Sequence, residues 1–488
     1  MKVAFVSTSV ECLGIEYISA MLKPRGHEVR LFMDQRFFND EYITVGWLSR
    51  LFDSKKRIIE EIKTYKPDII GFSVMSDFYP WACEIARLIK KEMNVPIIFG
   101  GIHPTSVPER VIKNDFVDVV CISEGEYPML ELANSMDKGA IDYSIKNLWF
   151  KKNGKVIRND LRPLLNNLDS LPIADKDIYY TLRPHYSDLY YISTSRGCKY
   201  SCSYCCHSYA RGMYNQKISY FRRRSIANVI QEIEAAQKKY KIKHVRFFDE
   251  SFGADLVWLR EFSKQYKKIE GRGFVCYMHP NDVTAEAIGY LKEAGCFQVE
   301  LGVQSLTERI NQQIFKRNSS NAKIALAIDI IKNAQINLAT DNILGIPGQT
   351  DDDIIKLIEF YNQRRVNRIY FYWLRFYPKT DLTEWAKETG LLSETDYKKI
   401  ADGQVNRTYL VRSDGYNKSF IKLQFLIFLM PYLTRNLVRF FLRYRLYRFF
   451  YVFHSPIWLA MFASLRRYLK KNNGENLGFF AGRNLLKT

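Results

Sequence analysis

The sequence predicts an α/β protein with a doubly wound parallel sheet, then a partial barrel of six strand–helix units, then a mostly helical C-terminal region. Strand-like and helix-like segments alternate in two blocks, residues 1–140 and 190–385, which predicts parallel sheets covered by helices. Residues 386–488 lose this alternation, and their Phe, Tyr, Leu and Arg residues lie in stretches that look helical. A chain of 488 residues has room for roughly two to four such domains.

The first block contains five strand-like segments, Lys2–Ser7, Glu28–Met33, Asp68–Ser73, Pro96–Phe99 and Val117–Ile122. Gly14–Lys23 and Pro80–Met93 are typical of the helices between them. In the second helix, Pro80 fits the first turn and the apolar residues recur at helical spacing. We therefore expect a five-stranded doubly wound domain over residues 1–140.

Residues 141–189 interrupt the pattern. Lys151–Lys155 is typical of a hairpin turn, and Leu171-Pro172 and Arg183-Pro184 break regular structure. We expect this segment to be a linker that packs between two domains.

The second block contains six strand-like segments, Tyr190–Thr194, His244–Phe248, Gly273–Met278, Phe297–Gly302, Leu338–Leu344 and Arg368–Leu374. Helices such as Ile226–Tyr240 and Asn321–Asn333 fit between them. Six such units predict a complete or partial barrel, in which the loops that follow the strands carry the chemistry.

Composition narrows the class of protein. Apolar residues make up 47% and charged residues 25%, which is typical of a folded chain and argues against disorder. Met1 and Lys2 lead straight into a strand-like stretch, and no run of about 18 apolar residues occurs. We therefore expect a cytoplasmic protein without an export leader or a spanning helix. Four of the nine cysteines lie within nine residues, which favours metal binding over disulfides.

Three of these cysteines form a C-x3-C-x2-C motif directly after the first barrel strand: Cys198, Cys202 and Cys205. Three thiolates on one tight loop can bind three corners of an iron–sulfur cube and leave one iron open. The alternative is a closed zinc site, which needs four ligands, and Cys206 or His207 could supply the fourth.

With Tyr204 between the second and third cysteines, this motif resembles the signature of radical S-adenosylmethionine (SAM) enzymes. Phe247–Phe252, Glu300–Ser305 and Asp341–Gly348 resemble later segments of that family in the same order, so the resemblance covers about residues 190–385. It implies a [4Fe-4S] cluster whose open iron binds SAM. One electron then cleaves SAM into methionine and a 5′-deoxyadenosyl radical, and an external low-potential electron donor is needed.

The resemblance also implies SAM contacts. Tyr204 would line the adenine site, while Gln304, Lys316 and Asp341 would lie near the ribose or the methionine part. Their amide, ammonium and carboxylate groups suit these contacts. Asp249 and Glu250 stand where the family has a Gly-Gly-Glu segment that contacts the SAM amino group. For Gln304, Lys316 and Asp341 the alternative is a surface or loop residue satisfied by solvent.

Two glycine-containing turns follow the fourth and fifth strands of the first block. Their candidate binding residues are Gly100, Gly101, His103, Glu124, Gly125 and Glu126. Doubly wound sheets bind ligands at this edge, although a glycine turn is often only a turn. Together with Leu13–Tyr17 and Gly26–Val29, the turns resemble the cobalamin-binding domain fused to one branch of radical SAM enzymes. The resemblance implies cobalamin without a lower-face histidine ligand, because the Asp-x-His-x-x-Gly motif is absent. A turn-stabilising role beside Pro104 is the alternative for His103.

A competing interpretation gives the chain a second cluster, held by Cys12, Cys83 and Cys121, as in tRNA methylthiotransferases. Against it, Cys83 points away from the apolar stripe of its predicted helix and Cys121 lies inside a predicted strand. The flanking residues do not match that family either.

The positive charge of the chain is concentrated near its end. The chain has 72 basic and 52 acidic residues, and Gly415–Gly474 holds eleven Lys or Arg and no Asp or Glu. Phe440–Phe450 mixes Arg with aromatics and Tyr451–Leu465 is apolar, which favours contact with an anionic membrane surface. A helical cap on the barrel and an RNA-binding surface are the alternatives. Apolar runs such as Leu423–Leu433 favour the membrane over RNA.

The sequence therefore predicts a cobalamin-binding radical SAM enzyme, peripheral on the inner membrane face. Its substrate would be a small hydrophobic molecule of the lipid or tetrapyrrole class, modified at an unactivated carbon. Methyl transfer and oxidation or cyclisation, as in the anaerobic cyclase of bacteriochlorophyll synthesis, both stay open. The alternatives are a methylthiotransferase-like RNA-modifying enzyme and a non-catalytic, cluster-bearing membrane or RNA adaptor. We do not expect nucleic acid as a partner.

Overall fold

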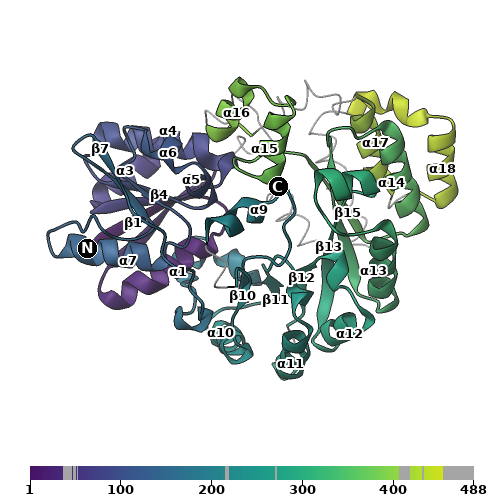
Figure 1. Cartoon of the computed structure of the whole chain (residues 1–488). Coiled ribbons are helices and arrows are strands. Elements are labelled where there is room, and N and C mark those ends of the chain that lie inside the picture. Colours follow the sequence, from purple (N-terminus) through teal and green to yellow (C-terminus); the bar gives the residue numbers. More distant parts are fainter. Residues whose placement is uncertain are drawn as a thin grey trace.

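The computed structural model describes residues 1–36, 47, 51, 53–214, 219–269, 272–405, 418–430 and 433–453. Two sheets with covering helices lie side by side, the first on the left and the second on the right of Figure 1. No helix in these ranges is both long enough and apolar enough to cross a membrane.

The first sheet has seven strands in the order β2-β1-β3-β4-β5-β6-β7. They are β1 (Lys2–Thr8), β2 (Glu28–Asp34), β3 (Ile69–Ser73), β4 (Ile97–Gly100), β5 (Val119–Cys121), β6 (Leu148–Lys152) and β7 (Lys155–Arg158). The first five pair in parallel, as predicted, whereas β6 and β7 are antiparallel. The predicted hairpin turn is confirmed: Asn153 and Gly154 both have positive φ, as tight hairpins require. This hairpin extends the sheet from the five predicted strands to seven.

Helices cover both faces of the first sheet. They are α1 (Leu13–Leu22), α3 (Lys55–Tyr65), α4 (Tyr79–Glu92), α5 (Ile102–Ser106), α6 (Pro108–Ile112) and α7 (Glu126–Asp137), with the short turns η1 (Lys23–Arg25) and η2 (Ser76–Phe78). Alternate residues of β1 enter different cores: Val3 and Phe5 pack with Ile15, whereas Ala4 and Val6 pack with Ile85. The predicted doubly wound arrangement is confirmed.

A connecting segment joins the two sheets and holds η3 (Leu168–Ser170), α8 (Asp177–Tyr180) and η4 (Pro184–Asp188). Its Lys176 is 1% exposed and pairs with Glu11 at 2.9 Å and Glu16 at 2.6 Å. Because both carboxylates belong to the start of the chain, this buried triad fixes the segment against α1.

The second sheet has six parallel strands in the order β15-β14-β13-β12-β11-β8. They are β8 (Leu189–Ile192), β11 (His244–Phe247), β12 (Phe274–Met278), β13 (Cys296–Gln304), β14 (Asn337–Leu344) and β15 (Arg368–Trp373). The helices outside them are α10 (Ile226–Lys239), α11 (Leu256–Tyr266), α12 (Ala285–Glu293), α13 (Asn321–Asn333) and α14 (Asp351–Gln363). β8 and β15 do not pair, so the predicted partial barrel is confirmed.

Shorter elements line the mouth of the barrel. They are β9 (Ser195–Arg196), α9 (His207–Ala210), η5 (Arg211–Met213), β10 (Arg222–Arg223), η6 (Phe252–Ala254), η7 (Pro280–Asp282) and the π-helix η8 (Ile310–Ile314). β9 and β10 pair in antiparallel fashion on either side of the cysteine motif. In Figure 1, α9 lies between the two sheets.

The described C-terminal region is helical: α15 (Asp381–Glu388), α16 (Glu394–Ala401), α17 (Lys418–Leu429), α18 (Arg435–Arg443) and η10 (Leu446–Phe453). In α17 and just after it, Leu423, Leu426, Ile427 and Met430 recur at helical spacing and are buried in the core outside the barrel. This corrects one argument from the sequence, because these four residues of the apolar run Leu423–Leu433 are packed and are not free to contact a membrane. Most of the predicted membrane stretch Tyr451–Leu465 lies outside the described residues.

Candidate active site between the two sheets

The cysteine motif lies on the loop that joins β9 to α9. Cys202 is buried, and Cys198 and Cys205 are half-buried. Gly197 begins the loop at φ +78°, and a side chain there would collide with the backbone of Tyr220, so only glycine fits. The loop therefore has one tightly defined path.

Asp249, a predicted SAM contact, braces the chain just before this loop. It is 2% exposed and accepts hydrogen bonds from the Thr194 amide at 3.1 Å and the Thr194 hydroxyl at 2.7 Å. The Ser195 hydroxyl donates to it as well. In this structure the carboxylate positions the loop.

Two donors point at the thiols of the motif. The Tyr200 amide donates to Cys198 Sγ at 3.4 Å, and Arg317 Nη1 donates to Cys202 Sγ at 3.6 Å. Burial raises the pKa of the Cys198 thiol to about 12, so this thiol is protonated until a metal displaces the proton. Hydrogen-bond donors and a cation stabilise metal-bound thiolates. The donor set therefore fits three corners of an iron–sulfur cube.

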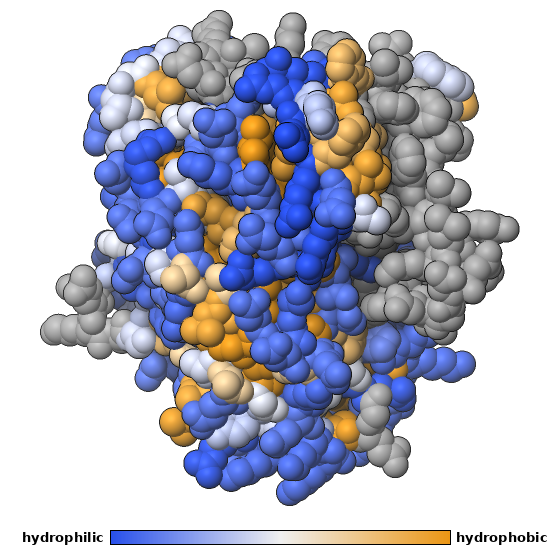
Figure 2. All heavy atoms as spheres, turned by 90° about the vertical axis from the view of Figure 1, so that its right-hand side faces the viewer, coloured by the Kyte–Doolittle hydropathy of each residue, from blue (hydrophilic) through white to orange (hydrophobic). Residues whose placement is uncertain are grey.

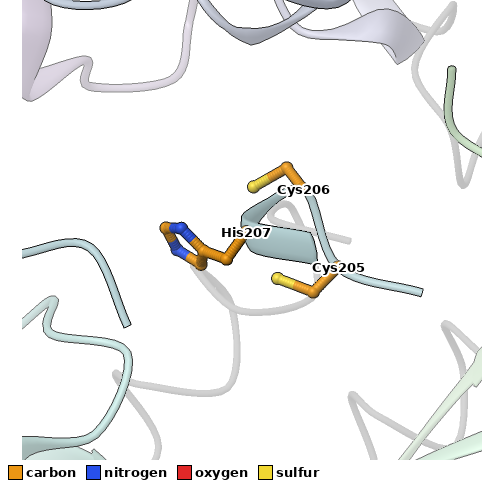
Figure 3. Close-up of side chains that lie close together, drawn as sticks. All are labelled: Cys205, Cys206 and His207. Carbon is orange, nitrogen blue, oxygen red and sulfur yellow. The ribbon is translucent and has the colours of Figure 1, made fainter. Parts of the chain in front are cut away.

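The alternative metal site lies one step further along the chain. Ligand atoms of Cys205, Cys206 and His207 all lie within 4.8 Å of one another (Figure 3). Both imidazole nitrogens already have neighbours, since Nδ1 lies 2.7 Å from the Tyr220 hydroxyl and Nε2 lies 3.2 Å from the Glu250 carboxylate. Within the described part of the chain this group has three ligands, one fewer than a closed zinc site.

Arg317 is the functional candidate that sequence reasoning missed. Its guanidinium is buried, and besides the Cys202 thiol it donates to the Tyr204 hydroxyl at 3.0 Å and the Gly302 carbonyl at 2.5 Å. The predicted Lys316 instead lies at the surface, 58% exposed, and pairs with Asp381 at 3.4 Å. The sequence shows that Lys316 and Arg317 are adjacent basic residues, but their distance along the chain from Gln304 does not tell which side chain points inward.

Two other predicted SAM contacts lie near Arg317. The Tyr204 ring packs edge-on against Phe315 with centroids 4.6 Å apart. Gln304 ends β13 with φ +67°, and a Cβ at Gly302 would meet the amide of Gln304 and the guanidinium of Arg317. Tyr204, Gln304 and Arg317 therefore form one group beside the cysteine motif.

Asp341 belongs to a polar group inside the barrel. Alternate residues of β11, β12 and β13 pack with the covering helices, so Arg246, Tyr277 and Glu300 face the interior. Arg246 pairs with Glu300 at 2.5 Å and donates to the Tyr277 hydroxyl. Burial and the nearby Glu300 carboxylate raise the pKa of Asp341 to about 7, although Arg246 opposes this. Near neutral pH the carboxyl group of Asp341 is therefore present in both its protonated and its ionised form.

A cavity of about 290 Å³ lies at the carboxyl ends of the first sheet. The predicted residues that line it are Gly100, Gly101, Glu124, Gly125 and Glu126. Gly101 has φ +100°, and a Cβ there would lie 2.7 Å from the Val74 backbone, so this turn requires glycine. Glycine walls leave backbone open to a large ligand.

His103 lies outside this cavity. It is fully buried, and its Nδ1 lies 2.9 Å from the Ser76 hydroxyl. Its ring packs on the Tyr79 ring, with the two ring centroids 4.1 Å apart. Burial lowers the pKa of His103 to about 4. The residues that line the cavity include no histidine.

The cysteines of the competing second-cluster interpretation are divided between the two faces of the first sheet. Cys12 and Cys121 belong to the core that contains α1, whereas Cys83 packs into the core on the other face. Because the sheet separates them, these three thiols do not converge on one cluster.

Ion pairs connect the cavity to the cysteine loop. Arg196, two residues before Cys198, pairs with Glu124 at 3.1 Å and Glu126 at 2.5 Å. Arg222 pairs with Glu124 at 2.9 Å. Burial alone would raise the pKa of Glu124, but the two guanidinium groups hold it below its usual value. Arg196 also lines the cavity, so the two candidate cofactor sites adjoin.

The two halves of this site match two known families. Residues 3–133 match the family model of the B12 binding domain, and residues 192–361 match that of the radical SAM superfamily. The chain therefore belongs to the cobalamin-binding radical SAM enzymes, and its cofactors are a [4Fe-4S] cluster, SAM and cobalamin.

Individual relatives extend across both domains. An uncharacterized methyltransferase of Pyrococcus horikoshii, PH0819, is 27% identical over 81% of this chain and 82% of its own length. The anaerobic magnesium-protoporphyrin IX monomethyl ester cyclase of Rubrivivax gelatinosus is 23% identical over 70% of this chain and 60% of its own length. The radical SAM methyltransferase TsrM of Kitasatospora setae, solved with cobalamin and a [4Fe-4S] cluster, has the same fold at 17% identity. Its TM-score is 0.64 over 79% of this chain and 78% of TsrM.

Proposed function

We propose that this enzyme cleaves SAM reductively and uses the resulting 5′-deoxyadenosyl radical to take a hydrogen atom from an unactivated carbon of a small hydrophobic substrate. That carbon would then receive a methyl group from methylcobalamin, and the radical would leave as 5′-deoxyadenosine. The observation that carries the proposal is the contact between the two cofactor sites. Arg196 belongs to the strand before the cysteine loop and pairs with Glu124 and Glu126 of the cavity turn. A methyl donor in the cavity and a radical generator on the loop would therefore act on the same substrate.

The three cysteines of the loop and two residues that contact the loop or the chain before it have proposed tasks. Cys198, Cys202 and Cys205 hold the cluster, which together with SAM supplies one-electron cleavage of a carbon–sulfur bond. Arg317 stabilises the thiolate of Cys202, which it reaches at 3.6 Å. Asp249 positions the loop because it bonds the amide and the hydroxyl of Thr194 just before it.

The SAM site would be formed by residues at the barrel mouth. Tyr204 and Gln304 lie beside Arg317, and Asp341 has hydrogen-bonding capacity within the barrel. Glu250, exposed beside the loop, is the proposed partner of the SAM amino group. A contact between Lys316 and SAM stays a prediction.

Cobalamin would lie in the glycine-walled cavity, where it supplies a transferable methyl group. Gly100, Gly101 and Gly125 leave backbone open to it, and Glu124 and Glu126 close one side together with Arg196. The lining suits a corrin chemically, because backbone and carboxylate groups can bond its amide side chains.

Methyl transfer is favoured over cyclisation because the relative PH0819, named a methyltransferase, matches four fifths of both chains. The likeness to the anaerobic cyclase supports the second candidate, oxidation or cyclisation of a substrate radical. Phe248, which directly follows β11 and is 39% exposed, supports a hydrophobic substrate in either case.

The test begins with anaerobic reconstitution and analysis of iron, sulfide and cobalt. We expect about four irons per chain, cobalt near stoichiometry and 5′-deoxyadenosine after addition of SAM and dithionite. Cys202→Ala should abolish both iron binding and SAM cleavage, whereas the matched variant Cys206→Ala should retain both. One zinc per chain without SAM cleavage would overturn the proposal.

A second experiment separates the two outcomes. SAM with a deuterated methyl group is added together with a lipid extract, and products are analysed by mass spectrometry. A product that carries the deuterated methyl group supports methyl transfer. A product lighter by hydrogen atoms, without the label, supports oxidation or cyclisation instead.

A further inference from the structure

The helix α18 has three distinct sides. Val438 is buried, with Phe441 and Leu442 half-buried on the same side, and this side packs into the core that contains α14. Leu437, Phe440 and Tyr444, at positions i, i+3 and i+7, form a second side that is exposed by 39%, 48% and 58%. Phe449 of η10 is exposed by 77%. Packing of the helix therefore leaves an apolar stripe in solvent.

The third side is basic. Arg435, Arg439 and Arg443 recur at four-residue spacing, and Arg445 and Arg448 follow. Residues 433–453 contain no Asp or Glu, and within the described ranges none of these five arginines pairs with a carboxylate. Figure 2, which views the molecule from the α18 side, shows apolar side chains directly beside strongly hydrophilic ones.

A folded protein gains nothing in water from four exposed apolar side chains flanked by five arginines that have no carboxylate partner among the described residues. A surface that offers both an apolar layer and negative charge can satisfy the two sides of α18 together. The interface of an anionic bilayer has this character, because the stripe enters the headgroup–acyl boundary while the arginines stay at the phosphates. A second copy of this chain is a poor partner, since a two-fold contact would bring like charges together.

The position of α18 is compatible with such contact. It packs on α14 outside the barrel and contacts η10, which in turn packs on α17, on the side remote from the first sheet (Figure 1). Asn362 of α14 donates to the Arg435 carbonyl at 3.0 Å, and the Thr434 hydroxyl caps the helix at 3.3 Å. The exposed stripe is therefore held on a rigid support, and the cofactor sites stay clear of it.

We propose that α18 and η10 form a docking surface for the anionic face of a phospholipid bilayer. Each arginine near such a surface strengthens binding by roughly fivefold, so loss of two arginines should weaken it by about 30-fold. The proposal does not depend on which reaction the enzyme catalyses.

The test uses the full chain and sedimentation with vesicles of phosphatidylcholine, with and without phosphatidylglycerol. We expect salt-sensitive binding only with phosphatidylglycerol. The charge variant R439Q/R443Q should bind about 30-fold more weakly, and the stripe variant F440S/Y444S should lose most binding. Matched controls on the opposite half of the molecule and on the barrel surface are Arg57→Gln and Val257→Ser, with exposures of 60% and 82%.

All substituted side chains are exposed, so the melting temperatures of the variants should equal that of the parent. A variant with a lower melting temperature is replaced by R445Q/R448Q, which lies beyond the helix. Equal binding by the parent and the charge variant would overturn the proposal. Tight binding to polyuridylate without binding to vesicles would also overturn it and assign the surface to RNA.

Discussion

Arg196 offers a quantitative test of how the two cofactor sites are joined. Substitution with Met removes the ion pairs to Glu124 and Glu126 but keeps a side chain of similar length. Glu124 retains Arg222 at 2.9 Å, whereas Glu126, 7% exposed in its side chain, loses its ion-pair partner. The damage should therefore fall on Glu126.

The magnitude follows from the burial of the pair. Removal of one partner from a buried pair costs about 3–5 kcal/mol. Because the Arg196 side chain is 22% exposed, the lower end applies, about 3 kcal/mol. Since 1.4 kcal/mol is a factor of ten, separation of the cavity turn from the cysteine loop should become on the order of 100-fold more frequent.

Hydrogen–deuterium exchange measures this separation directly. Peptides that cover residues 119–130 and 193–205 should exchange faster in Arg196→Met, while peptides from the outer helices α11 and α12 should not change. The control Arg57→Met removes an exposed pair within α3 and should leave all of these peptides unchanged.

Two further variants isolate the charge. Arg196→Lys keeps the charge but cannot bond two carboxylates with a planar fork, so its exchange should be intermediate. The double variant R196M/E126Q leaves no charge unpaired at Glu126 and should recover part of the protection. Unchanged exchange in Arg196→Met would refute the idea that this residue joins the two sites.

Three more predictions follow from single residues. Asp341 keeps its proton up to a pKa of about 7 when folded, but loses it near 3.8 when unfolded. Stability should therefore fall as pH rises between these values, and Asp341→Asn should raise the melting temperature more at pH 8 than at pH 5; equal shifts would contradict this. Gly101→Ala should lower the melting temperature through its backbone collision, whereas Gly289→Ala, with nothing within 4 Å, should not. Arg317→Met should make the cluster midpoint potential more negative in an EPR-monitored titration, because a cation stabilises the reduced cluster; Lys316→Met should leave it unchanged.

Much of the fold could be predicted because its signals are local. The first five strands of the first sheet and all six strands of the second sheet are short apolar runs between helix-like segments. The place of the hairpin β6–β7 was not predictable in this way, because its sequence defines a turn but not the strand beside which it lies. The partner of the hairpin is set by long-range packing, which pairs β6 with β5.

The site was predictable where spacing carries the information. The three cysteines follow from their motif, but the choice between Lys316 and Arg317 depends on the backbone. Lys316 lies two residues after the π-helix turn Ile310–Ile314 and has φ +48°, and this conformation directs Arg317 inward. No periodic pattern in the sequence reveals such a bend.

The C-terminal region shows how a composition signal can mislead. The run that begins at Leu423 suggested a surface for lipid, but its apolar residues recur at helical spacing and fill the core. The helical spacing of these apolar residues is present in the sequence. It could have shown that α17 packs into the core, whereas α18 has an exposed apolar side.

Among the residues that the structure describes, the open barrel leaves the backbone groups at the outer edge of β15 without a partner strand. α17 contacts this strand, so the C-terminal region shields a site at which chains would otherwise aggregate edge to edge. Truncation after residue 405 should therefore yield an insoluble protein, whatever its effect on lipid binding. The C-terminal region therefore covers the open edge of the barrel. We expect its removal to impair folding, so that any loss of function would follow from misfolding.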